Sequence, residues 1–516
     1  MSKKGMVYLT YQKDFSEKGN DRYFIYDGGS FSEVSSNQVV SLECFIVTHD
    51  FWLIASSLYR LHEALPKNII DVVLYSKIVA GKKSAGGDVQ SWDISKTVKP
   101  LYKEATDFDA YVDMYYRRKD LEPNTYMLFS HKLAEYFEVL SCLASRSGEL
   151  NRFYSLELPI YYELTLASCR GIRVDNDTVR KHKESLQLDF YRKLKAFAEK
   201  HCVLYEIPSE GEVRDKLADL GYHVNDYSLK FLLDFMPSKD GYTDDLRDLQ
   251  KTNKSFRIFN SISACSSRLS PVVESHWTST SRIYHRSPNL QNISKKYRGI
   301  FIPDSGMSLC YVDYDQFEVG IMAALSKDPQ MLNVFQNSDA YKSFSIKVFG
   351  DDAQRKKSKI LFLSYTYGMS LQNIIRSVKE AGGDEREAHK YFKGFSVFEC
   401  WREGVWGEFL KEGRIPTING NYLNRVGEAE LSDKEKRASV NHVIQGSATY
   451  IFKTALLALS KIEGVQILIP MHDAVLFQHN EKVDPSVAVS LFESVMTEEL
   501  KGVVKGKASI EEFFLG

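Results

Sequence analysis

Two aspartates in the C-terminal half of the chain follow apolar runs, and either could bind a divalent cation. Asp313 ends the apolar run 307–312, which has the length of a buried strand, and apolar residues at helical spacing follow from Phe317. Asp473 lies between the apolar runs 465–471 and 474–477, which predicts a hairpin with the acid at its tip. Hard divalent cations prefer carboxylate oxygens. Taken alone, Asp313 also fits a helix cap and His472 a plain turn residue.

Four residues at steps of four form one stripe on a predicted helix. They are Arg355, Lys359, Leu363 and Tyr367, and each step turns the helix by about 400°. Two cations followed by an aliphatic and an aromatic side chain suit a nucleoside triphosphate, with its base near Tyr367. Gly368 is placed to end this helix. The alternative is an amphipathic helix with solvated cations and a core Leu and Tyr.

Two further polar segments suit contacts with a nucleic acid. Arg437, Asn441 and Gln445 again stand at steps of four, and such side chains can contact the acceptors of the minor groove. The segment 280–298 carries Arg282, several amides and a basic cluster, which suits phosphate and base-edge contacts. An exposed polar helix and an ordinary surface loop are the alternatives.

Composition narrows the class of protein. A length of 516 residues predicts two or more domains, and a formal net charge of -1 means that any nucleic-acid site is a local groove. The 7 cysteines contain no Cys-x-x-Cys pair, which indicates a reducing compartment without structural zinc or a disulfide framework. No apolar run is long enough to span a bilayer, and no signal-peptide core follows the first residues. We therefore expect a cytoplasmic protein that does not bind a membrane.

The elements that must position these motifs fall into blocks. Residues 1 to about 150 read as an α/β unit, and the block that follows reads as an extended helical arm. We expect strands at 23–26 and 42–47, a strand or the start of a helix at 69–74, and helices at 126–143, 156–169 and 177–201.

In this order and spacing, the motifs resemble those of the family A DNA polymerases over about residues 155–516. Residues 313–318 are similar to the first palm motif, 355–368 to the fingers helix and 471–473 to the last palm motif. Residues 280–293 resemble the template-primer segment, and 437–445 the helix that checks the minor groove.

This resemblance implies a multidomain α/β fold, a right hand of palm, fingers and thumb preceded by a ribonuclease H-like exonuclease-type domain. The exonuclease-like domain is expected at 1–152 and the polymerase domain at 153–516. Within the polymerase domain we expect the thumb at about 175–268, the palm at about 269–330 and 430–516, and the fingers at about 331–429.

The resemblance also implies template-directed DNA synthesis from dNTPs on a primer 3′ end, with release of pyrophosphate. Asp313 and Asp473, with Tyr314, would hold two Mg²⁺ ions, for which Mn²⁺ can substitute. Lys359 would donate a proton to the pyrophosphate, and Glu318 would exclude a ribose hydroxyl.

The implied nucleotide ligands are Arg355, Lys359, Leu363, Tyr367, Gln316 and Glu318. The implied contacts to primer-template DNA are Arg282, Asn289, Gln291, Asn292, Arg437, Asn441, Gln445 and His472. We expect a monomer that works with replication accessory proteins.

The chain departs from the family pattern at four positions. Ala474 stands where the last motif usually has Glu, which predicts slower or differently metal-dependent catalysis. Leu363 replaces a usual aromatic residue and Ser364 a usual Gly, changes that bear on dideoxynucleotide handling and fidelity. Gly320 replaces an Arg that often follows the first motif.

The N-terminal block resembles the proofreading domain of the family, but its acids are not paired. Two-metal hydrolysis takes about four carboxylates. Asp27 is the candidate first acid, Gly29 stands where its paired Glu is expected, and the later acids fall on Ile54 and Ser130. Three other acids are unpaired candidates: Asp50, Asp71 and Asp88. We expect a retained fold without proofreading and no preceding flap nuclease domain, which by analogy favours a phage replicase.

Two alternatives remain open on sequence alone. A single-subunit RNA polymerase shares the two aspartates and the Arg-Lys-Tyr-Gly helix, but Glu318 argues against it because a ribose-using enzyme needs a small residue there. A catalytically silent DNA-binding scaffold is supported only by Ala474.

Overall fold

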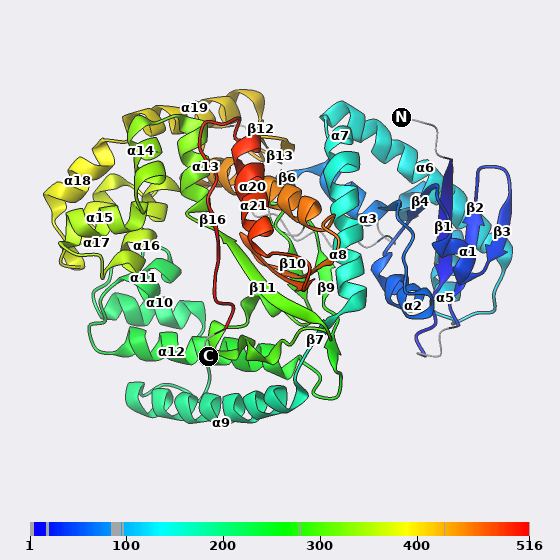
Figure 1. Ribbon diagram of the computed structural model, residues 1–516, viewed down its shortest axis with the longest axis horizontal. Coiled ribbons are helices and arrows are strands. Elements are labelled where there is room, and N and C mark those ends of the chain that lie inside the picture. The colour runs from blue at the N-terminus through cyan, green and yellow to red at the C-terminus, as the bar shows by residue number, and fades with distance from the viewer. Residues whose placement is uncertain are drawn as a thin grey trace.

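The computed structural model describes residues 5–16, 20–83, 94, 98–276, 278, 280–427 and 429–514. Figure 1 shows a smaller N-terminal unit, blue to cyan, beside a larger unit formed by the rest of the chain. Each unit has a hydrophobic core of its own. None of the helices in these ranges is long and apolar enough to cross a membrane.

The N-terminal unit is built on a five-stranded mixed sheet of order β3-β2-β1-β4-β5. β1 runs parallel to β4 and antiparallel to β2, and β4 runs parallel to β5. The central strand β1 was missed by the sequence analysis, and β4 begins at Phe45 rather than at Leu42. The strands are β1 (Met6–Gln12), β2 (Arg22–Tyr26), β3 (Phe31–Val34), β4 (Phe45–Thr48) and β5 (Ile69–Asp71).

Asp27, the candidate first acid of an exonuclease site, lies between β2 and β3. Asp27 follows β2, whose last residue pairs with Tyr8 in the N-terminal half of β1, whereas Asp50 follows β4, which runs parallel to β1. The carboxylate of Asp27 instead accepts hydrogen bonds from the main chain of Gly29 and Ser30 in an exposed turn. Asp27 thus lies away from β1, the central strand, and its candidacy as a first acid gains no support from the arrangement of this sheet.

Helices cover this sheet and lead into the larger unit. The long helix α6, expected from Tyr126 onward, packs on β1 and β2, and its Phe129 and Leu133 are fully buried. The ambiguous run 69–74 divides between β5 and α3. The helices are α1 (Ser36–Val40), α2 (Trp52–His62), α3 (Val72–Ala80), η1 (Lys99–Leu101), α5 (Ala105–Tyr115), α6 (Pro123–Ser147), α7 (Leu150–Arg152), the π-helical turn η2 (Phe153–Glu157) and α8 (Leu158–Arg170).

The larger unit is centred on a four-stranded antiparallel sheet of order β14-β15-β11-β16. Alternate residues of β11 face two cores, with Val312 and Tyr314 packed in one and Tyr311 in the other. The expected strand before Asp313 and the expected hairpin around Asp473 are both present. The strands are β11 (Met307–Tyr314), β14 (Val465–Pro470), β15 (Ala474–Asn480) and β16 (Ala508–Ile510).

Helices α13 (Phe317–Ser326), α20 (Asp433–Leu459) and α21 (Ser486–Glu499) pack around this sheet. The segment before β11 runs through short elements rather than through one long loop. These are β9 (Val272–Glu274), β10 (Tyr284–Arg286), η3 (Leu290–Asn292) and η4 (Lys295–Ile300).

Two helical arms extend from the sheet (Figure 1). In the first, α9 is capped by Asp175 and packs along α12, and a small sheet of β7 (Ile172–Arg173) and β8 (Arg268–Leu269) lies at its base. Its helices are α9 (Asn176–His201), α10 (Glu210–Asp219), α11 (Leu229–Phe235) and α12 (Tyr242–Asn260). The second contains α14 (Pro329–Asn337), α15 (Ala340–Phe349), α16 (Arg355–Thr366), α17 (Leu371–Glu380), α18 (Glu385–Lys393) and α19 (Ser396–Glu412).

A hairpin between this second arm and α20 also contacts the N-terminal unit. It consists of β12 (Arg414–Thr417) and β13 (Gly420–Asn424), and β6 (Lys82–Lys83) pairs parallel with β13. The two units therefore share a three-stranded sheet of order β12-β13-β6.

Candidate active site

Two carboxylates meet at the edge of the central sheet. Asp313 lies near the end of β11, directly opposite Ala474 of β15. Asp473 lies in the turn between β14 and β15, and its carbonyl oxygen accepts a hydrogen bond of 3.2 Å from the main-chain N–H of Tyr314. The strand and the hairpin thus bring together two acids that are far apart in sequence.

The environment of Asp313 fits a bound cation. Burial, with the charges of Asp473, Glu511 and Asp315, raises the pKa of Asp313 to about 8. Its Oδ1 atom is buried without a hydrogen-bond donor among the described residues. A carboxylate oxygen that no donor satisfies suits a divalent cation, which would also offset the repulsion between the acids.

The described chain offers no cluster of three or more His, Cys, Asp or Glu side chains arranged as a complete metal cage. A cation held here therefore needs other oxygens, from water and from substrate. This matches Mg²⁺, which keeps several waters and is bound through one or two carboxylates and substrate phosphates.

Asp313→Asn is expected to stabilise the protein in metal-free buffer. Because the pKa of Asp313 rises from 3.8 to about 8, the folded state keeps a proton that the unfolded chain releases, and the free energy of unfolding falls as pH rises through this window. In the wild type this titration lowers the free energy of unfolding by on the order of 1–3 kcal/mol near pH 8. Asn does not ionise, so the variant does not lose this free energy. Thermal unfolding in EDTA should give the variant the higher Tm at pH 8, with the difference shrinking toward pH 4. A lower Tm for the variant at pH 8 would contradict this account.

The predicted cationic stripe lies on α16, which ends before Tyr367 as expected from Gly368, whose φ is +99°. Arg355 and Lys359 both lie against the ring of the buried Tyr341, at 5.4 and 5.6 Å from its centroid. Arg355 also donates from Nη2 to Asp339 Oδ2 at 2.7 Å.

A second polar group surrounds Glu318 in the first turn of α13. Its Oε1 atom accepts from Gln445 Nε2 at 3.1 Å and from Arg282 Nη2 at 3.4 Å, and Gln445 also reaches the hydroxyl of Tyr367 at 3.4 Å. Burial raises the pKa of Glu318, although Tyr367 and Arg282 act in the opposite direction. Residues from four distant segments of the chain thus meet at one carboxylate.

Comparison with known proteins decides the family of the chain. The family model described as DNA polymerase family A matches residues 211–511, which is more than half of the chain. The chain belongs to DNA polymerase family A.

Curated relatives match this chain over part of their length. DNA polymerase theta of Caenorhabditis elegans is 32% identical over 245 residues, or 44% of this chain and 15% of that protein. The thermostable DNA polymerase I of Thermus aquaticus is 28% identical over 233 residues, or 41% of this chain and 28% of that protein. The matched region is therefore less than a third of each relative.

A solved structure shows the same fold over nearly the whole chain. It is described as the POL domain of Pol1 from M. smegmatis in complex with DNA primer-template and dNTP. The TM-score is 0.73 at 18% identity, with 98% of this chain and 94% of that chain covered. The likeness shows a shared right-hand polymerase fold.

Members of this family use divalent metal ions, which agrees with the environment of the Asp313 carboxylate. Tyr314 can contribute only through its main chain, because its hydroxyl donates to the carbonyl of Phe492 at 3.1 Å and its ring stacks on Phe317. Ala474 is fully buried opposite Asp313, so the position next to Asp473 on β15 carries no acidic side chain.

The structure shows the surroundings of two residues that depart from the family pattern, Gly320 and Leu363. A Cβ atom on Gly320 would lie 2.5 Å from Met496 and 2.7 Å from Phe335, so α13 packs too closely here for an Arg. Leu363 packs against the main core, where an aromatic residue is usual. No contact among the described residues explains why Ser364 replaces the usual Gly.

The other predicted nucleotide contact, Gln316, is tied to the start of α15. Its Oε1 atom accepts from the main-chain N–H of Ala340 at 2.7 Å, and its Nε2 atom donates to the carbonyl of Ser338 at 3.4 Å. Gln316 thereby links the loop after Asp313 to the helix that carries Tyr341.

The predicted DNA contacts of the polymerase differ in accessibility. Gln291 is 8% exposed and its amide donates to the carbonyls of Ile283 and Pro470, so it joins the template-primer segment to β14. Asn292 accepts a hydrogen bond from Lys254, and Asn289 donates to Tyr284. These contacts organise the segment 280–293.

The remaining predicted DNA contacts lie on partly or fully exposed surface. Arg437 is exposed on α20, with Asn441 half-buried one turn further on. His472 is exposed in the hairpin turn, and desolvation by the surrounding chain, with Arg282 nearby, lowers the pKa of its imidazole. Arg298, in the expected basic cluster, is instead buried, and its guanidinium lies 4.9 Å from the ring centroid of Phe513.

Asp339 and Tyr341 are site residues that sequence reasoning missed. Asp339 caps α15 through the main-chain N–H groups of Tyr341 and Lys342, and holds Arg355 with its other oxygen. An N-cap aspartate and a core tyrosine carry no functional signal in sequence, because their role depends on the packing of α15 on α16.

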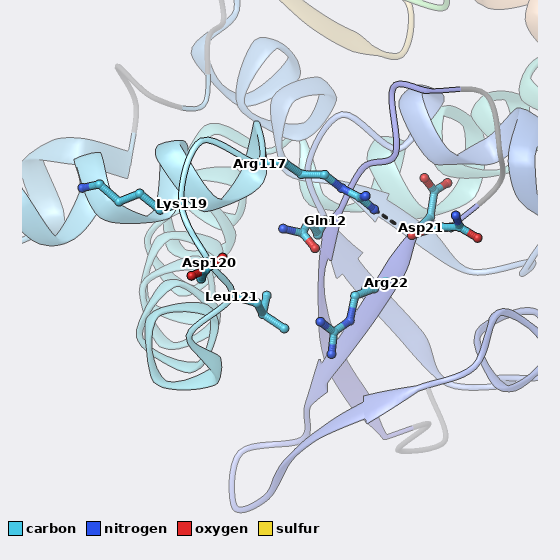
Figure 2. Close-up of a pocket in the computed structure, with 8 residues that line it drawn as sticks. Gln12, Asp21, Arg22, Arg117, Lys119, Asp120 and Leu121 are labelled. Atoms are coloured by element: carbon cyan, nitrogen blue, oxygen red, sulfur yellow. Dashed lines mark hydrogen bonds between the residues drawn. The ribbon is translucent and has the colours of Figure 1, made fainter.

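A pocket of about 610 Å³ lies in the N-terminal unit, beyond the last residue of β1 (Figure 2). Arg117 crosses it and donates to the carbonyl of Asn20 at 3.0 Å. Asp21 is already paired with Lys13 at 2.9 Å. The lining residues are Gln12, Asn20, Asp21, Arg22, Arg117, Lys119, Asp120 and Leu121, which provide no pair of free carboxylates.

Proposed function

We propose that this chain is a DNA-directed DNA polymerase, which adds dNTPs to a primer 3′ end and releases pyrophosphate. The observation that carries the proposal is the convergence of the cationic stripe on the carboxylates. The charge of Lys359 acts to lower the pKa of both Asp313 on β11 and Glu318 on α13, which supports a position of the N-terminal half of α16 close to these two acids. Triphosphate cations and metal-binding acids are the two parts that phosphoryl transfer needs.

In the proposed mechanism, Asp313 and Asp473 hold two divalent cations, Mg²⁺ or in its place Mn²⁺. Such ions lower the pKa of the primer hydroxyl and stabilise the charge on the transferred phosphoryl group. Arg355 and Lys359 bind the triphosphate, and Lys359 is placed to give a proton to the pyrophosphate. Tyr367 stacks at the nascent base pair.

Primer-template DNA is the proposed macromolecular ligand. Arg282 and Gln445 contact Glu318, and His472 directly precedes Asp473, so these three would hold the primer end, and Asn441 would face the minor groove. Gln291, Asn289 and Asn292 support the segment that carries Arg282. We further propose a monomer that works with replication accessory proteins.

The right-hand parts are assigned by the same reasoning. We propose α9–α12 as the thumb, the central sheet with α13, α20 and α21 as the palm, and α14–α19 as the fingers. The mixed sheet of residues 1–152 with its flanking helices supports an exonuclease-like domain of ribonuclease H type.

Primer extension with dNTPs, with rNTPs and without nucleotide tests the proposal. Template-dependent extension with dNTPs supports it. Equal use of rNTPs would favour the RNA polymerase alternative, and DNA binding without any extension would favour a silent scaffold.

Glu318→Ala is expected to raise rNTP incorporation by about tenfold or more and to lower dNTP efficiency several-fold. The partly buried carboxylate of Glu318, held by Gln445 and Arg282, fills the space where a ribose hydroxyl would point. Single-nucleotide incorporation with matched dNTP and rNTP measures the ratio.

Glu318→Gln is the matched control, because it keeps the size of the side chain and removes its charge. Exclusion by size predicts that this variant still rejects rNTPs. Unchanged sugar selectivity in Glu318→Ala would remove the gate assignment.

We also propose that the protein does not proofread. Where β1 ends, Thr10 and Ser130 are buried against each other at 3.1 Å between hydroxyls, and the Gln12 amide donates to the carbonyl of Met114. Asp71 is 3% exposed and accepts hydrogen bonds from Phe51 and other donors, which leaves it unsuited to a cation. Asp88 lies outside the described residues.

The expected result is that a mismatched primer stays intact in Mg²⁺ or Mn²⁺ without dNTPs, because two-metal hydrolysis takes about four carboxylates. Gel analysis over time, with a proofreading polymerase as positive control, measures the shortening. Progressive shortening that Asp71→Asn or Asp50→Asn abolishes would show that an exonuclease site survives.

A further inference from the structure

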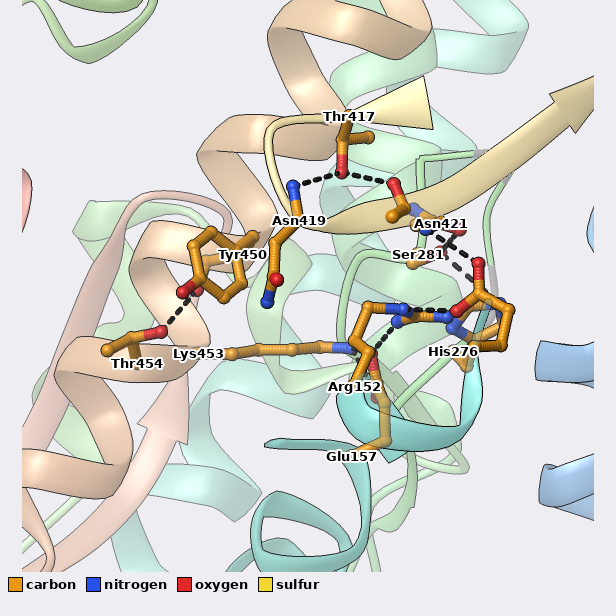
Figure 3. A network of polar contacts seen from close by, with 12 residues as sticks. Arg152, Glu157, His276, Ser281, Thr417, Asn419, Asn421, Tyr450, Lys453 and Thr454 are labelled. Atoms are coloured by element: carbon orange, nitrogen blue, oxygen red, sulfur yellow. Dashed lines mark hydrogen bonds and ion pairs between the residues drawn. The ribbon is translucent and has the colours of Figure 1, made fainter. Parts of the chain in front are cut away.

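A buried cluster of charged side chains joins the N-terminal unit to the polymerase core (Figure 3). Arg152 of α7 donates from Nε to Glu149 Oε2 and from Nη1 to Glu157 Oε1, each at 2.5 Å. Lys453 of α20 donates to Glu157 Oε2 at 2.8 Å. None of these four side chains is more than 5% exposed. Two cations and two acids balance, so loss of one partner leaves a buried group uncompensated.

The cluster continues to the loop that carries Arg282. The main-chain N–H of Asn421 in β13 donates to Glu149 Oε1 at 2.8 Å. Asn421 Oδ1 accepts from the hydroxyl of Ser281 at 3.1 Å, and the next residue, Arg282, contacts Glu318. A continuous set of contacts therefore runs from the N-terminal unit to the carboxylate proposed to exclude ribose.

Both residues at the middle of this path have left-handed backbone. The φ angles are +60° at Ser281 and +57° at Asn421. Non-glycine residues adopt this region at a cost in energy and keep it when their surroundings determine it. Both are buried, and Ser281 also contacts Nε2 of His276, whose pKa burial lowers well below its usual value. The conformation of the Arg282 loop thus depends on the neighbours that hold it.

A second connection fixes the same hairpin to the N-terminal unit. β6 pairs with β13 at Lys82–Leu423 and Lys83–Asn424, and Lys82 Nζ donates to the carbonyl of His276 at 3.3 Å. The N-terminal unit therefore supports both the hairpin and the loop before Arg282.

We propose that Arg152 is a positioning residue for the polymerase reaction. Together with Glu149, it holds Asn421 and Ser281 so that Arg282 stays against Glu318 at the primer end. This inference rests on the proposed function. It gives the N-terminal unit a part in synthesis, independent of any hydrolytic chemistry.

Single-turnover primer extension by the full chain tests the proposal. Wild type, Arg152→Gln, Arg282→Ala and the double variant are compared. We expect Arg152→Gln to lower the maximal rate about tenfold while the dNTP Kd stays within about twofold, and the double variant to lose little beyond Arg282→Ala, because both changes remove one coupled contact. Arg152→Lys keeps the charge without the two-pronged geometry and should restore part of the rate.

Arg425→Gln is the matched control. Arg425 is similarly buried, with a 6% exposed side chain paired with Glu435 at 3.3 Å, and among the described residues it makes no hydrogen bond or ion pair with the Ser281 path. In the double variant, the loss of rate caused by Arg425→Gln should multiply with the loss caused by Arg282→Ala. If Arg152→Gln unfolds at the assay temperature, Ser281→Ala removes a single hydroxyl and should show the same lack of additivity.

Independent, multiplicative losses for the Arg152 and Arg282 changes would overturn the inference, as would a loss confined to dNTP affinity. These outcomes require a wild type that extends primers. A wild type that binds primer-template but never extends it contradicts the proposed function itself.

Discussion

Asp313→Asn and Asp473→Asn are each expected to reduce primer extension by about three orders of magnitude or more, with primer-template binding largely kept. The two carboxylates converge at one edge of the sheet, and Ala474 leaves no third acid beside them on β15. Each substitution removes a negative charge from a site that has few protein ligands for a cation. Binding by fluorescence anisotropy and single-turnover extension separate the two effects.

Asp315→Asn is the matched control for this prediction. Asp315 is a third acid close to Asp313, but its Oδ1 atom accepts a hydrogen bond from Ser509 at 2.9 Å. We expect a loss below about tenfold, because Asn can accept the same bond. Near-normal extension by either Asp313→Asn or Asp473→Asn would remove the assignment of the two acids as metal ligands.

The lower activity and the higher stability expected of Asp313→Asn have one physical origin. Without a cation, a buried acid beside Asp473 costs free energy in the folded state, which raises its pKa. The same unpaired oxygen that destabilises the free protein is available to a cation. Loss of activity together with a higher Tm in EDTA is therefore the joint signature of a site built for a metal rather than for structure.

Sequence alone was informative where local pattern determines the element. The apolar run before Asp313, the hairpin around Asp473 and the stripe on α16 each depend on period and length, and all three are present. The three-dimensional cluster at Glu318 could be expected only through the family resemblance, because its members come from separate segments.

The N-terminal unit was harder to predict. β1 carries neither an acid nor a flanking signal that marks it as the central strand, so the sequence offered only Asp27, after β2, as a candidate first acid. Register across the sheet, which decides which side chains meet, is a tertiary property. The buried path from Arg152 to Ser281 could not be predicted either, because it also depends on tertiary contacts between distant segments.

Exposure was the other property that spacing could not determine. Gln291 and Arg298 were expected on a DNA-binding surface because they are polar and lie on irregular backbone. Both are buried, with their polar groups bonded to main-chain carbonyls. A polar side chain that organises a loop has the same sequence signature as one that contacts a ligand.

Lys359→Ala is expected to lower the efficiency of dNTP incorporation by about a hundredfold or more, mainly through triphosphate use. Lys359 is exposed on α16 and has no ion pair among the described residues, so its ammonium is free to meet phosphates. Arg355, in contrast, is held by Asp339, and its removal would leave that carboxylate without its partner. The Lys359 variant is therefore the cleaner probe of the triphosphate site.

Pre-steady-state incorporation gives the maximal rate and the dNTP Kd separately, and a proton-donor role adds a change in the pH profile of the maximal rate.

Lys357→Ala is the matched control, since two residues along a helix turn it by about 200° and place Lys357 on the opposite face of α16. We expect that control to stay within about twofold of wild type, because a surface charge away from the site contributes little. Equal losses for Lys357→Ala and Lys359→Ala would mean that α16 needs only positive charge in general. A weaker dNTP Kd with an unchanged pH profile for Lys359→Ala would leave it as a phosphate ligand and exclude it as the proton donor.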